Sequence, residues 1–239
     1  MLKLALLGYG KMGKELERLA IQRGHQIIVK IDTDEDWAQH YGEVALADAA
    51  IDFSIPTAVV KNIERCFDLN VPVVVGTTGW NNQLEPIKSK CLNENKSMVY
   101  SANFSVGVNI FFEVNKLLAK LMNNHCEYDV WMEEIHHIHK LDAPSGTAIT
   151  LANDIISNIT RKQKWNNTLT SESEALGIRS VRQDEEPGTH TVTYESDVDI
   201  IEIKHTAKNR RGLASGALLA AEWIKDKKGF FTMKDILQL

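Results

Sequence analysis

The stretch from Leu2 to residue 23 constrains the fold most strongly. Leu2 to Leu7 form a nearly continuous apolar run, which is typical of a strand buried on both faces. The run ends in a G-x-G-x-x-G turn, Gly8 to Gly13, and helical periodicity follows over residues 12 to 23. A strand, a glycine turn and a helix in this order predict a turn that binds the phosphates of a dinucleotide.

Each glycine of the turn has its own expected role. Gly8 permits the tight turn, Gly10 lets a pyrophosphate approach the backbone, and Gly13 lets the helix pack closely on the strand. A second predicted strand, Gln26 to Ile31, ends at Asp32. We expect the Asp32 carboxylate to bind the adenosine ribose hydroxyls, against the alternative that it is a surface aspartate at a strand end.

The alternation of strands and helices continues to about residue 101. Strands are predicted at 50–55, 71–75 and 97–101, with helices at 57–69 and 81–92 between them. Such alternation is typical of a parallel, doubly wound sheet, in which ligands bind beyond the carboxyl ends of the strands. Two more polar turns follow these strand ends and are expected to contact the nucleotide: Gly76-Thr77-Thr78-Gly79 and Ser101-Ala102-Asn103-Phe104.

The pattern changes after Ser105. The predicted elements are helices at 107–122, 147–160 and 212–225, strands at 128–135, 177–183, 189–195 and 198–206, and a polar loop at 161–174. Runs of strands after alternating units predict a separate α+β domain with an open, largely antiparallel sheet.

We therefore expect an α/β chain of two domains. Residues 1–105 plus 211–239 should form a doubly wound, Rossmann-type parallel sheet domain that binds a dinucleotide. Residues 106–210 should form a second α+β domain, with an open mixed or antiparallel sheet, for substrate binding and oligomerisation.

Composition excludes several classes of partner. The net charge of −5 offers no basic balance for nucleic acid or an anionic membrane, and no apolar stretch approaches the roughly 18 residues of a membrane span. The cysteines Cys66, Cys91 and Cys126 are sparse and widely spaced, which is typical of buried thiols in a reducing cytoplasm. We therefore expect a cytoplasmic protein that acts on a small molecule.

Reactive side chains are densest between Glu134 and Thr147. His136 and Lys140 are four apart, so either a strand or a helix would place them on one face. A histidine with a pKa near its usual value of about 6.5 can donate protons, and Lys140 adds a cation. Free amides at Gly146 and Thr147, where a predicted helix begins, form an anion pocket. These features suit a small carboxylate substrate that accepts a hydride and a proton.

This stretch allows two other interpretations. His136, His137 and His139 could bind a metal, but their spacing matches no standard zinc pattern and no nearby cysteine supplies a ligand, so we expect no metal. They could also be structural histidines at a domain seam. His139 has no role that its spacing supports.

The order and spacing of these motifs resemble the 4-hydroxy-tetrahydrodipicolinate reductase family, the dihydrodipicolinate reductases of lysine and diaminopimelate biosynthesis. The block from Glu134 to Ala148 is the most specific part of the resemblance, and the three turns at the strand ends come in the family's order. The family's carboxyl-terminal pattern resembles His205-x-Ala207-x-x-Arg210 and Ser215-Gly216-Ala217.

The resemblance implies reduction of a cyclic, doubly carboxylated imine by NADH or NADPH, and a homotetramer joined through the sheets of the second domain. His136 is implied as the proton donor and acceptor, Lys140 as a proton donor, and His137, Gly146 and Thr147 as substrate-binding residues. The implied cofactor-binding residues are Gly8, Tyr9, Gly10, Lys11, Met12, Gly13, Asp32, Gly76, Thr77, Thr78, Ser101, Ala102, Asn103 and Phe104.

The choice between NADH and NADPH stays open. Asp32 should repel a 2′-phosphate, whereas the Lys11 cation should attract one. Thr33 stands where some family members have an arginine. Two other functions are also open: another two-domain NAD(P)-dependent dehydrogenase, which would tolerate loss of the 136–147 block, and a non-catalytic nucleotide-sensing module.

Overall fold

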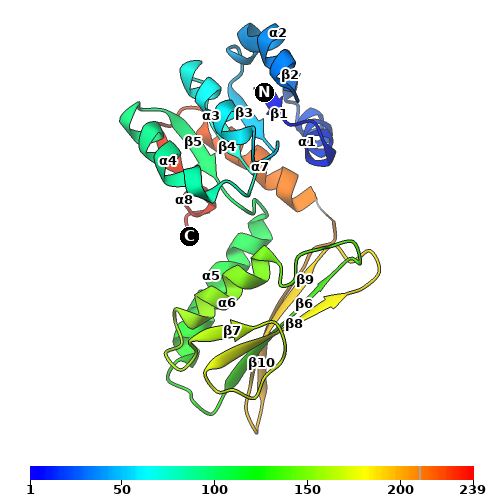
Figure 1. Cartoon of the computed structure of the whole chain (residues 1–239), viewed down its shortest axis with the longest axis vertical. Coiled ribbons are helices and arrows are strands. Elements are labelled where there is room, and N and C mark those ends of the chain that lie inside the picture. Colours follow the sequence, from blue (N-terminus) through cyan, green and yellow to red (C-terminus); the bar gives the residue numbers. More distant parts are fainter. Residues whose placement is uncertain (210) are drawn as a thin grey trace. The chain divides into compact units, whose positions relative to one another are not determined.

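The computed structural model describes residues 1–209 and 211–239, so Arg210 of the carboxyl-terminal pattern lies outside the described residues. The chain forms two compact units (Figure 1). Unit 1 comprises Met1–Val106 and Arg211–Leu239, and unit 2 comprises Gly107–Arg210. Each unit has its own sheet and core and is described by itself.

The sheet of unit 1 is parallel, with the strand order β11-β5-β4-β3-β1-β2 among the described residues. The strands are β1 (Lys3–Leu7), β2 (Gln26–Ile31), β3 (Ala49–Asp52), β4 (Val73–Val75), β5 (Ser97–Tyr100) and β11 (Gly229–Phe231). The chain reverses its direction of progress across the sheet at β1, which lies between β2 and β3, and such a reversal is typical of a doubly wound, Rossmann-like sheet. The prediction of a doubly wound parallel sheet is therefore confirmed, and β11 extends it.

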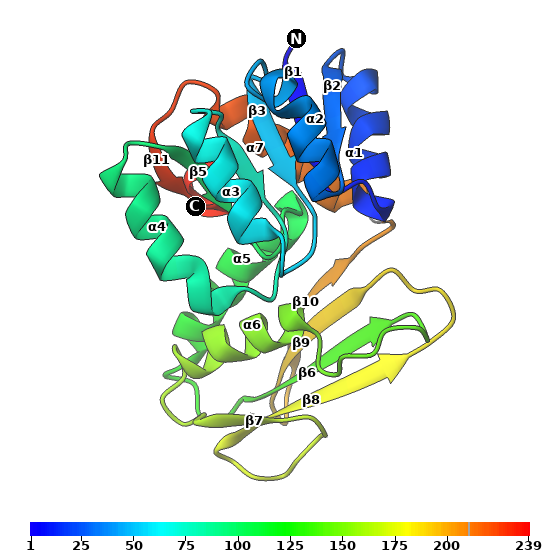
Figure 2. The ribbon, with the colours of Figure 1, turned by 45° about the horizontal axis from the view of Figure 1, so that its top comes forward.

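Helices cover both faces of this sheet (Figure 2). The helices are α1 (Lys11–Gln22), α2 (Asp34–Val44), α3 (Val59–Asp68), α4 (Leu84–Asn93), α7 (Arg211–Ile224) and α8 (Met233–Leu237). Alternate residues of β1 explain the two layers. Leu4 and Leu6 pack in one core with α1, α7 and α8, whereas Ala5 and Leu7 pack in another with α2, α3 and α4.

Helix α2 was not among the predicted helices. Its buried residues are only Trp37 and Val44, so it shows weak hydrophobic periodicity. A capping box marks its start instead, because the Thr33 side chain accepts the Asp36 N–H while the Asp36 carboxylate accepts the Thr33 N–H.

The sheet of unit 2 has the strand order β10-β9-β6-β8-β7 among the described residues. Its elements are α5 (Val106–Met122), β6 (Asp129–His136), α6 (Gly146–Ile156), β7 (Lys164–Asn166), β8 (Ala175–Arg182), β9 (Thr189–Glu195) and β10 (Ile200–Thr206). Side chains of α5 and α6 form one core with Met132 of β6, Ile178 of β8 and Val192 of β9. The predicted α+β unit with an open mixed sheet is confirmed.

Two details of the second sheet differ from the sequence-based expectation. Strand β7 lies in the segment expected to be a polar loop, and β6 pairs in parallel with β8 although the sheet was expected to be largely antiparallel. Half of the strand pairs are antiparallel, namely β6 with β9 and β9 with β10. The long connection through α6 allows the parallel return, which a hairpin cannot make.

None of the helices in residues 1–209 and 211–239 has the length and apolar character needed to cross a membrane. Cys66 and Cys91 are buried, as expected, but the expectation is wrong for Cys126, which is exposed.

Candidate active site

The glycine turn of unit 1 has the geometry that a phosphate-binding turn requires. Gly8 has a φ of +88°, and a Cβ there would lie 2.3 Å from the carbonyl oxygen of Phe53. A Cβ on Gly13 would lie 2.4 Å from the Gly8 carbonyl oxygen, so this glycine lets α1 approach the turn. Above Gly10, by contrast, no atom lies within 4 Å of a Cβ position. The N-terminus of α1 is therefore open to an anion at Gly10.

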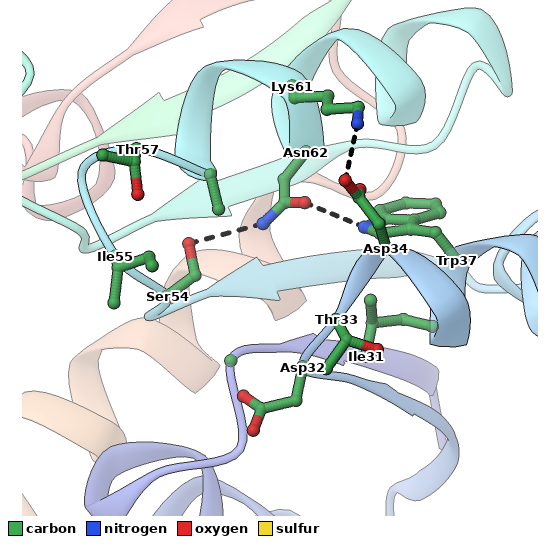
Figure 3. Close-up of a pocket in the computed structure, with 12 residues that line it drawn as sticks. Ile31, Asp32, Thr33, Asp34, Trp37, Ser54, Ile55, Thr57, Lys61 and Asn62 are labelled. Carbon is green, nitrogen blue, oxygen red and sulfur yellow. Dashed lines mark hydrogen bonds and ion pairs between the residues drawn. The ribbon is translucent and has the colours of Figure 1, made fainter.

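A cavity of about 530 Å³ adjoins this turn, at the carboxyl ends of β1, β2 and β3 (Figure 3). Its lining residues are Gly8, Ile31, Asp32, Thr33, Asp34, Trp37, Ser54, Ile55, Thr57, Ala58, Lys61 and Asn62. Asp32 is exposed at the rim, and its Oδ1 accepts the Tyr9 N–H at 2.9 Å. The carboxylate thus stabilises the glycine turn and also lines the cavity, where a ribose hydroxyl would meet it.

A buried polar network lies beneath the cavity and starts from Asp52, the last residue of β3. The Asp52 carboxylate is fully buried and accepts hydrogen bonds from Thr77 Oγ1 at 2.6 Å, Ser54 Oγ at 2.8 Å and Asn62 Nδ2 at 2.8 Å. Asn62 Oδ1 in turn accepts the Trp37 indole N–H. The network therefore connects the cavity wall to the Gly76–Gly79 turn.

The turns after β4 and β5 are held by close packing and local hydrogen bonds. A Cβ on Gly76 would lie 2.3 Å from the Phe53 ring, and the Phe53 and Phe104 rings are 6.0 Å apart. Ser101 Oγ donates to the Asn103 carbonyl oxygen. Thr78 and Ala102 are exposed, so these turns present polar backbone at the same edge as the glycine turn.

In unit 2, His136 is the last residue of β6, and Lys140 lies in the turn that follows. Neither a strand nor a helix covers both residues, so the periodicity expected to pair them does not apply. Instead the chain forms a turn after His136, in which the Lys140 N–H donates to the His137 carbonyl oxygen. Lys140 Nζ donates to both carboxylate oxygens of Asp142, at 2.7 and 2.8 Å.

Helix α6 begins at Gly146, beside this turn. Ser145 is its N-cap, and the Ser145 hydroxyl accepts the Ala148 N–H. The amides of Gly146 and Thr147 belong to the first turn, where the helix itself offers no acceptor. Gly146 is exposed, and no atom lies within 4 Å of a Cβ position there. The predicted anion pocket is therefore accessible.

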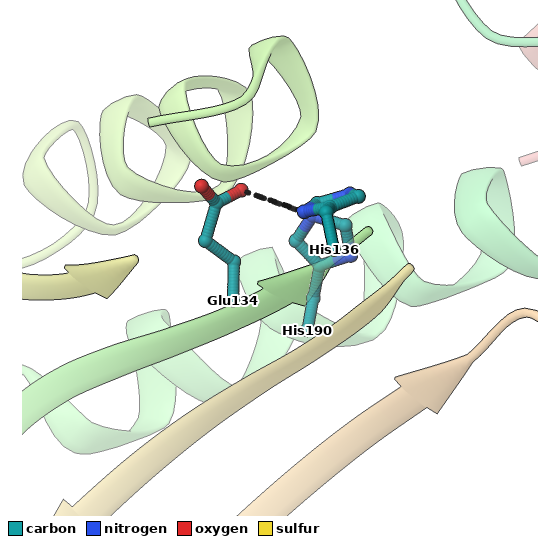
Figure 4. Close-up of side chains that lie close together, drawn as sticks. All are labelled: Glu134, His136 and His190. Carbon is teal, nitrogen blue, oxygen red and sulfur yellow. Dashed lines mark ion pairs between the residues drawn. The ribbon is translucent and has the colours of Figure 1, made fainter. Parts of the chain in front are cut away.

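Glu134, to which the sequence assigned no role, connects these parts of unit 2. Its fully buried carboxylate accepts the Ser145 N–H and a hydrogen bond from Arg182 Nη2, both near 3.1 Å. His136 Nδ1 lies 3.4 Å and His190 Nε2 lies 3.7 Å from Glu134 Oε2 (Figure 4). Strands β6, β8 and β9 thus each contribute one or two side chains to a single cluster.

The ionisation of this cluster follows from burial and charge. Burial lowers the pKa of His190 to about 3, with a further contribution from His136. Burial also lowers the pKa of His136, while Glu134 opposes the shift. For Glu134 burial favours the neutral acid, but hydrogen bonds from Ser145 and Arg182 outweigh it and lower the pKa. At neutral pH the cluster therefore holds one carboxylate, one guanidinium and two neutral imidazoles.

Glu134, His136 and His190 also offer ligand atoms within 4.8 Å of one another, as a metal site would. His190 is distant from the other two residues in the sequence, so spacing along the chain does not indicate this cluster. However, both oxygens of Glu134 already accept the Ser145 N–H, and Arg182 supplies a positive charge to the same carboxylate. The absence of a metal stays a prediction.

The other two histidines of the stretch differ in exposure. The His139 side chain is 67% exposed and pairs with Glu185 at 3.0 Å, in agreement with the lack of any argued role. His137 is half-buried, and its ring centroid lies 6.0 Å from that of His139.

Arg182 and Asp52 are further residues that the sequence reading missed. Arg182 donates to Glu134 and also to the Asp142 carbonyl oxygen, so it holds the turn that carries Lys140. The position of Arg182 at the end of a β-rich segment was the only available signal. Asp52 ends a predicted buried strand, and a charged residue there could have been noted as unusual.

The comparisons with known proteins agree over both halves of the chain. Family models described as dihydrodipicolinate reductase, N-terminus and C-terminus, match residues 2–104 and 107–237. The chain belongs to the dihydrodipicolinate reductase family. The predicted resemblance and the predicted class of enzyme, an NAD(P)H-dependent oxidoreductase, are therefore confirmed.

Relatives support the same family over the full length. The chain is 48% identical to the 4-hydroxy-tetrahydrodipicolinate reductase of Christiangramia forsetii over 236 residues, which cover 99% of this chain and 98% of the relative. It is 37% identical to the enzyme of that name from Thermosipho africanus over 239 residues, with the same two shares covered.

A solved structure shares the fold. The dipicolinate-bound dihydrodipicolinate reductase from Paenisporosarcina sp. TG-14 aligns with a TM-score of 0.76 at 22% identity, over 97% of each chain. The two-unit architecture of this chain is thus that of a solved dihydrodipicolinate reductase.

Proposed function

We propose that this chain reduces the cyclic imine formed from 4-hydroxy-tetrahydrodipicolinate to tetrahydrodipicolinate, in lysine and diaminopimelate biosynthesis. One observation carries the assignment beyond family membership. Within unit 2, the proton-handling His136 and the cations Lys140 and Arg182 adjoin the open N-terminus of α6. A doubly carboxylated ring that gains a hydride and a proton needs this combination.

Unit 1 binds the nicotinamide dinucleotide, NADH or NADPH, at the carboxyl edge of its sheet. The open backbone at Gly10 takes the pyrophosphate, and the cavity beside Asp32 takes the adenosine. The cofactor-binding residues are Gly8, Tyr9, Gly10, Lys11, Met12, Gly13, Asp32, Gly76, Thr77, Thr78, Ser101, Ala102, Asn103 and Phe104. A carboxylate at the cavity rim favours NADH, since it repels a 2′-phosphate.

Unit 2 binds the substrate through its carboxylates. The amides of Gly146 and Thr147 accept one of them at the positive end of α6, and His137 contributes a further contact. Lys140 Nζ pairs with Asp142 Oδ1 at 2.7 Å. A substrate carboxylate takes the place of Asp142 as the partner of Lys140. Dipicolinate, the ligand in the solved relative, is a small dicarboxylate of this kind.

The proposed step assigns a task to each of these groups. When bound, the dihydronicotinamide supplies a hydride to C4 of the ring. Negative charge then develops toward the ring nitrogen and its carboxylate, where Lys140 stabilises it and where Lys140 and the protonated form of His136 supply the proton. Preorganised charges of this kind typically lower a barrier by roughly 3 kcal/mol.

The assembly is a homotetramer joined through the sheets of unit 2, acting in the cytoplasm. Exposed apolar side chains at the start of β10 and just before it support such contacts, because Val198, Ile200 and Ile201 are 86%, 58% and 37% exposed. Light scattering coupled to size exclusion would test the assembly.

The decisive experiment is a turnover assay with freshly prepared cyclic substrate. Turnover is measured as the loss of near-ultraviolet absorbance when NADH, or in a parallel assay NADPH, is oxidised. We expect turnover with this substrate and none with amino acids or sugars. Binding of NADH without turnover on the cyclic imine would overturn the proposal in favour of a nucleotide-sensing module. Turnover on an amino acid or sugar alone would overturn it in favour of another dehydrogenase.

A further inference from the structure

Glu134 is a buried charge whose role the proposed reaction does not explain. Its side chain is fully buried on β6, two residues before His136. Burying a carboxylate is costly unless hydrogen bonds and opposite charges compensate for the lost hydration. A buried side chain of this kind is therefore expected to hold specific neighbours in place.

The neighbours of Glu134 belong to three separate parts of the substrate site. Its two oxygens accept the Ser145 N–H at 3.1 and 3.0 Å, which fixes the residue that caps α6. Arg182 Nη2 donates to Oε1 from β8 and to the Asp142 carbonyl oxygen in the turn of Lys140. His136 is the third neighbour. One carboxylate thus joins the anion pocket, the Lys140 turn and the proton-handling imidazole.

The contact with His136 selects one ring nitrogen. His136 Nδ1 is buried and makes no hydrogen bond within the described residues, and Glu134 Oε2 lies 3.4 Å away. The negative charge of Glu134 on this side of the ring therefore favours a proton on Nδ1. The opposite nitrogen, Nε2, faces Gly188, where a Cβ would lie only 3.0 Å away. The glycine, with a φ of +144°, leaves the Nε2 edge free of a side chain.

The other charges around His136 show why this carboxylate matters. On β6 and its following turn, Glu134 and Asp142 raise the pKa of His136 while Lys140 lowers it. Arg182 of β8 also lowers it. The centroid of the neutral His190 ring on β9 lies 5.0 Å from that of His136. The charge of His205 on β10 contributes to lowering the pKa of His190. Glu134 is the buried anion among these groups.

We propose that Glu134 is a positioning residue: its negative charge keeps a proton on His136 Nδ1, and its two oxygens accept the Ser145 N–H. It thereby makes Nε2 the proton-handling atom and holds that atom at a fixed place relative to the carboxylate-binding start of α6. The inference deepens the proposed function, because it assigns the residue that orients the acid–base group of that site.

The first test uses the wild-type protein without substrate. Nitrogen-15 NMR of the histidine side chains reports which ring nitrogen carries the proton in neutral His136, and the His136→Gln variant identifies its signals. We expect the Nδ1–H tautomer. A predominant Nε2–H tautomer would overturn the proposal. Because this measurement needs no turnover, it stays decisive even if the assigned reaction proves wrong.

The second test is the pH dependence of kcat in a Glu134→Gln variant. If protonated His136 donates, activity falls as pH rises through its pKa. Removing the carboxylate lowers that pKa. We therefore expect the alkaline limb of the pH profile, over which kcat falls, to move to lower pH. We also expect kcat to fall about 100-fold, with the Kd for NADH unchanged, as for lost acid–base catalysis. An alkaline limb at the wild-type position would overturn the proposal.

Two matched variants separate positioning from general structural support. Glu133→Gln removes the neighbouring carboxylate of β6, which pairs with Arg179 and is 25% exposed. Both kcat and the pH at which the alkaline limb falls should therefore stay unchanged. Glu134→Asp keeps the charge, and it should return the limb toward its wild-type position even with reduced kcat. If Glu134→Gln fails to fold, the tautomer measurement and the Glu134→Asp profile decide the question.

Discussion

Asp52 of unit 1 and Glu134 of unit 2 are both fully buried carboxylates, but their partners differ in charge. Asp52 accepts hydrogen bonds from the neutral groups of Thr77, Ser54 and Asn62. Within residues 1–209 and 211–239, no ion pair to Asp52 is formed. Burial therefore dominates and raises the pKa of Asp52, while the hydrogen bonds moderate the shift.

Glu134 has a cation, Arg182, and a backbone amide on the same carboxylate. Burial again favours the neutral acid, but these donors prevail and the pKa falls. The difference teaches how each unit uses a buried acid. In unit 1 the partners of the buried acid are uncharged, and they form part of the cavity wall, whereas in unit 2 a charged partner stabilises the carboxylate beside His136 and the start of α6.

The largest expected effect belongs to unit 2 and tests its chemical role. Replacing Lys140 by Met or His136 by Gln should lower kcat by roughly 100-fold or more, because charge stabilisation and proton donation are lost. The Kd for NADH, measured by fluorescence titration, should stay unchanged. His139→Gln, which alters only an exposed side chain, is the matched control. Wild-type kcat in the Lys140 variant would contradict its assigned role.

A change in unit 1 should show the reverse pattern. Asp32→Ala removes a charged acceptor at the cavity rim, and loss of such a hydrogen bond should weaken NADH binding by roughly 10-fold or more. The kcat at saturating NADH should change little. Glu35→Ala on the exposed side of α2 controls for the loss of one negative charge. An unchanged Kd for NADH would remove Asp32 from the nucleotide site.

Two glycines separate binding from stability within unit 1. Gly10→Ala meets no atom within 4 Å, so the Tm should stay, while the added methyl group obstructs the pyrophosphate and raises the KM for NADH several-fold. Gly13→Ala places a Cβ 2.4 Å from the Gly8 carbonyl oxygen, so the Tm should fall. Thermal melts and NADH titrations of both variants measure this. Equal loss of Tm in both variants would refute the separation.

The smallest effects concern stability against pH, where the two acids should differ in sign. The raised pKa of Asp52 contributes stability below its ordinary pKa of 3.8 that is lost as pH rises through the folded-state value. The lowered pKa of Glu134 contributes stability above the ordinary 4.5 that is lost as pH falls through the folded-state value.

The loss of Tm in Asp52→Asn should therefore be greater at acidic than at neutral pH, and the loss in Glu134→Gln greater at neutral pH. The expected differences are a few degrees, at about 2–4 °C for each kcal/mol. Calorimetric melts from about pH 3.5 to about pH 7 measure both slopes. Slopes of the same sign would mean that the two carboxylates do not differ in ionisation.

Much of unit 1 could be predicted from local sequence. The apolar run of β1, the glycine turn and the alternation that follows are short-range patterns, and they predicted the parallel sheet and the edge at which a ligand is expected. Strand β11 and helix α2 were not predicted, because β11 is three residues long and α2 buries few residues. Short or weakly periodic elements owe their structure to the neighbours they pack against.

In unit 2 the chain by itself determined that His136, Lys140, Gly146 and Thr147 occur close together, because they lie within one short segment. Only the tertiary structure decided that Glu134, Arg182 and His190 meet there. Arg182 and His190 lie 48 and 56 positions after Glu134 in the chain. The parallel pairing of β6 with β8 brings Arg182 to Glu134. An alternating pattern predicts which face of a strand is buried but not which strand lies beside it. The charge state of a buried carboxylate depends on such neighbours, so it could not be read from the sequence.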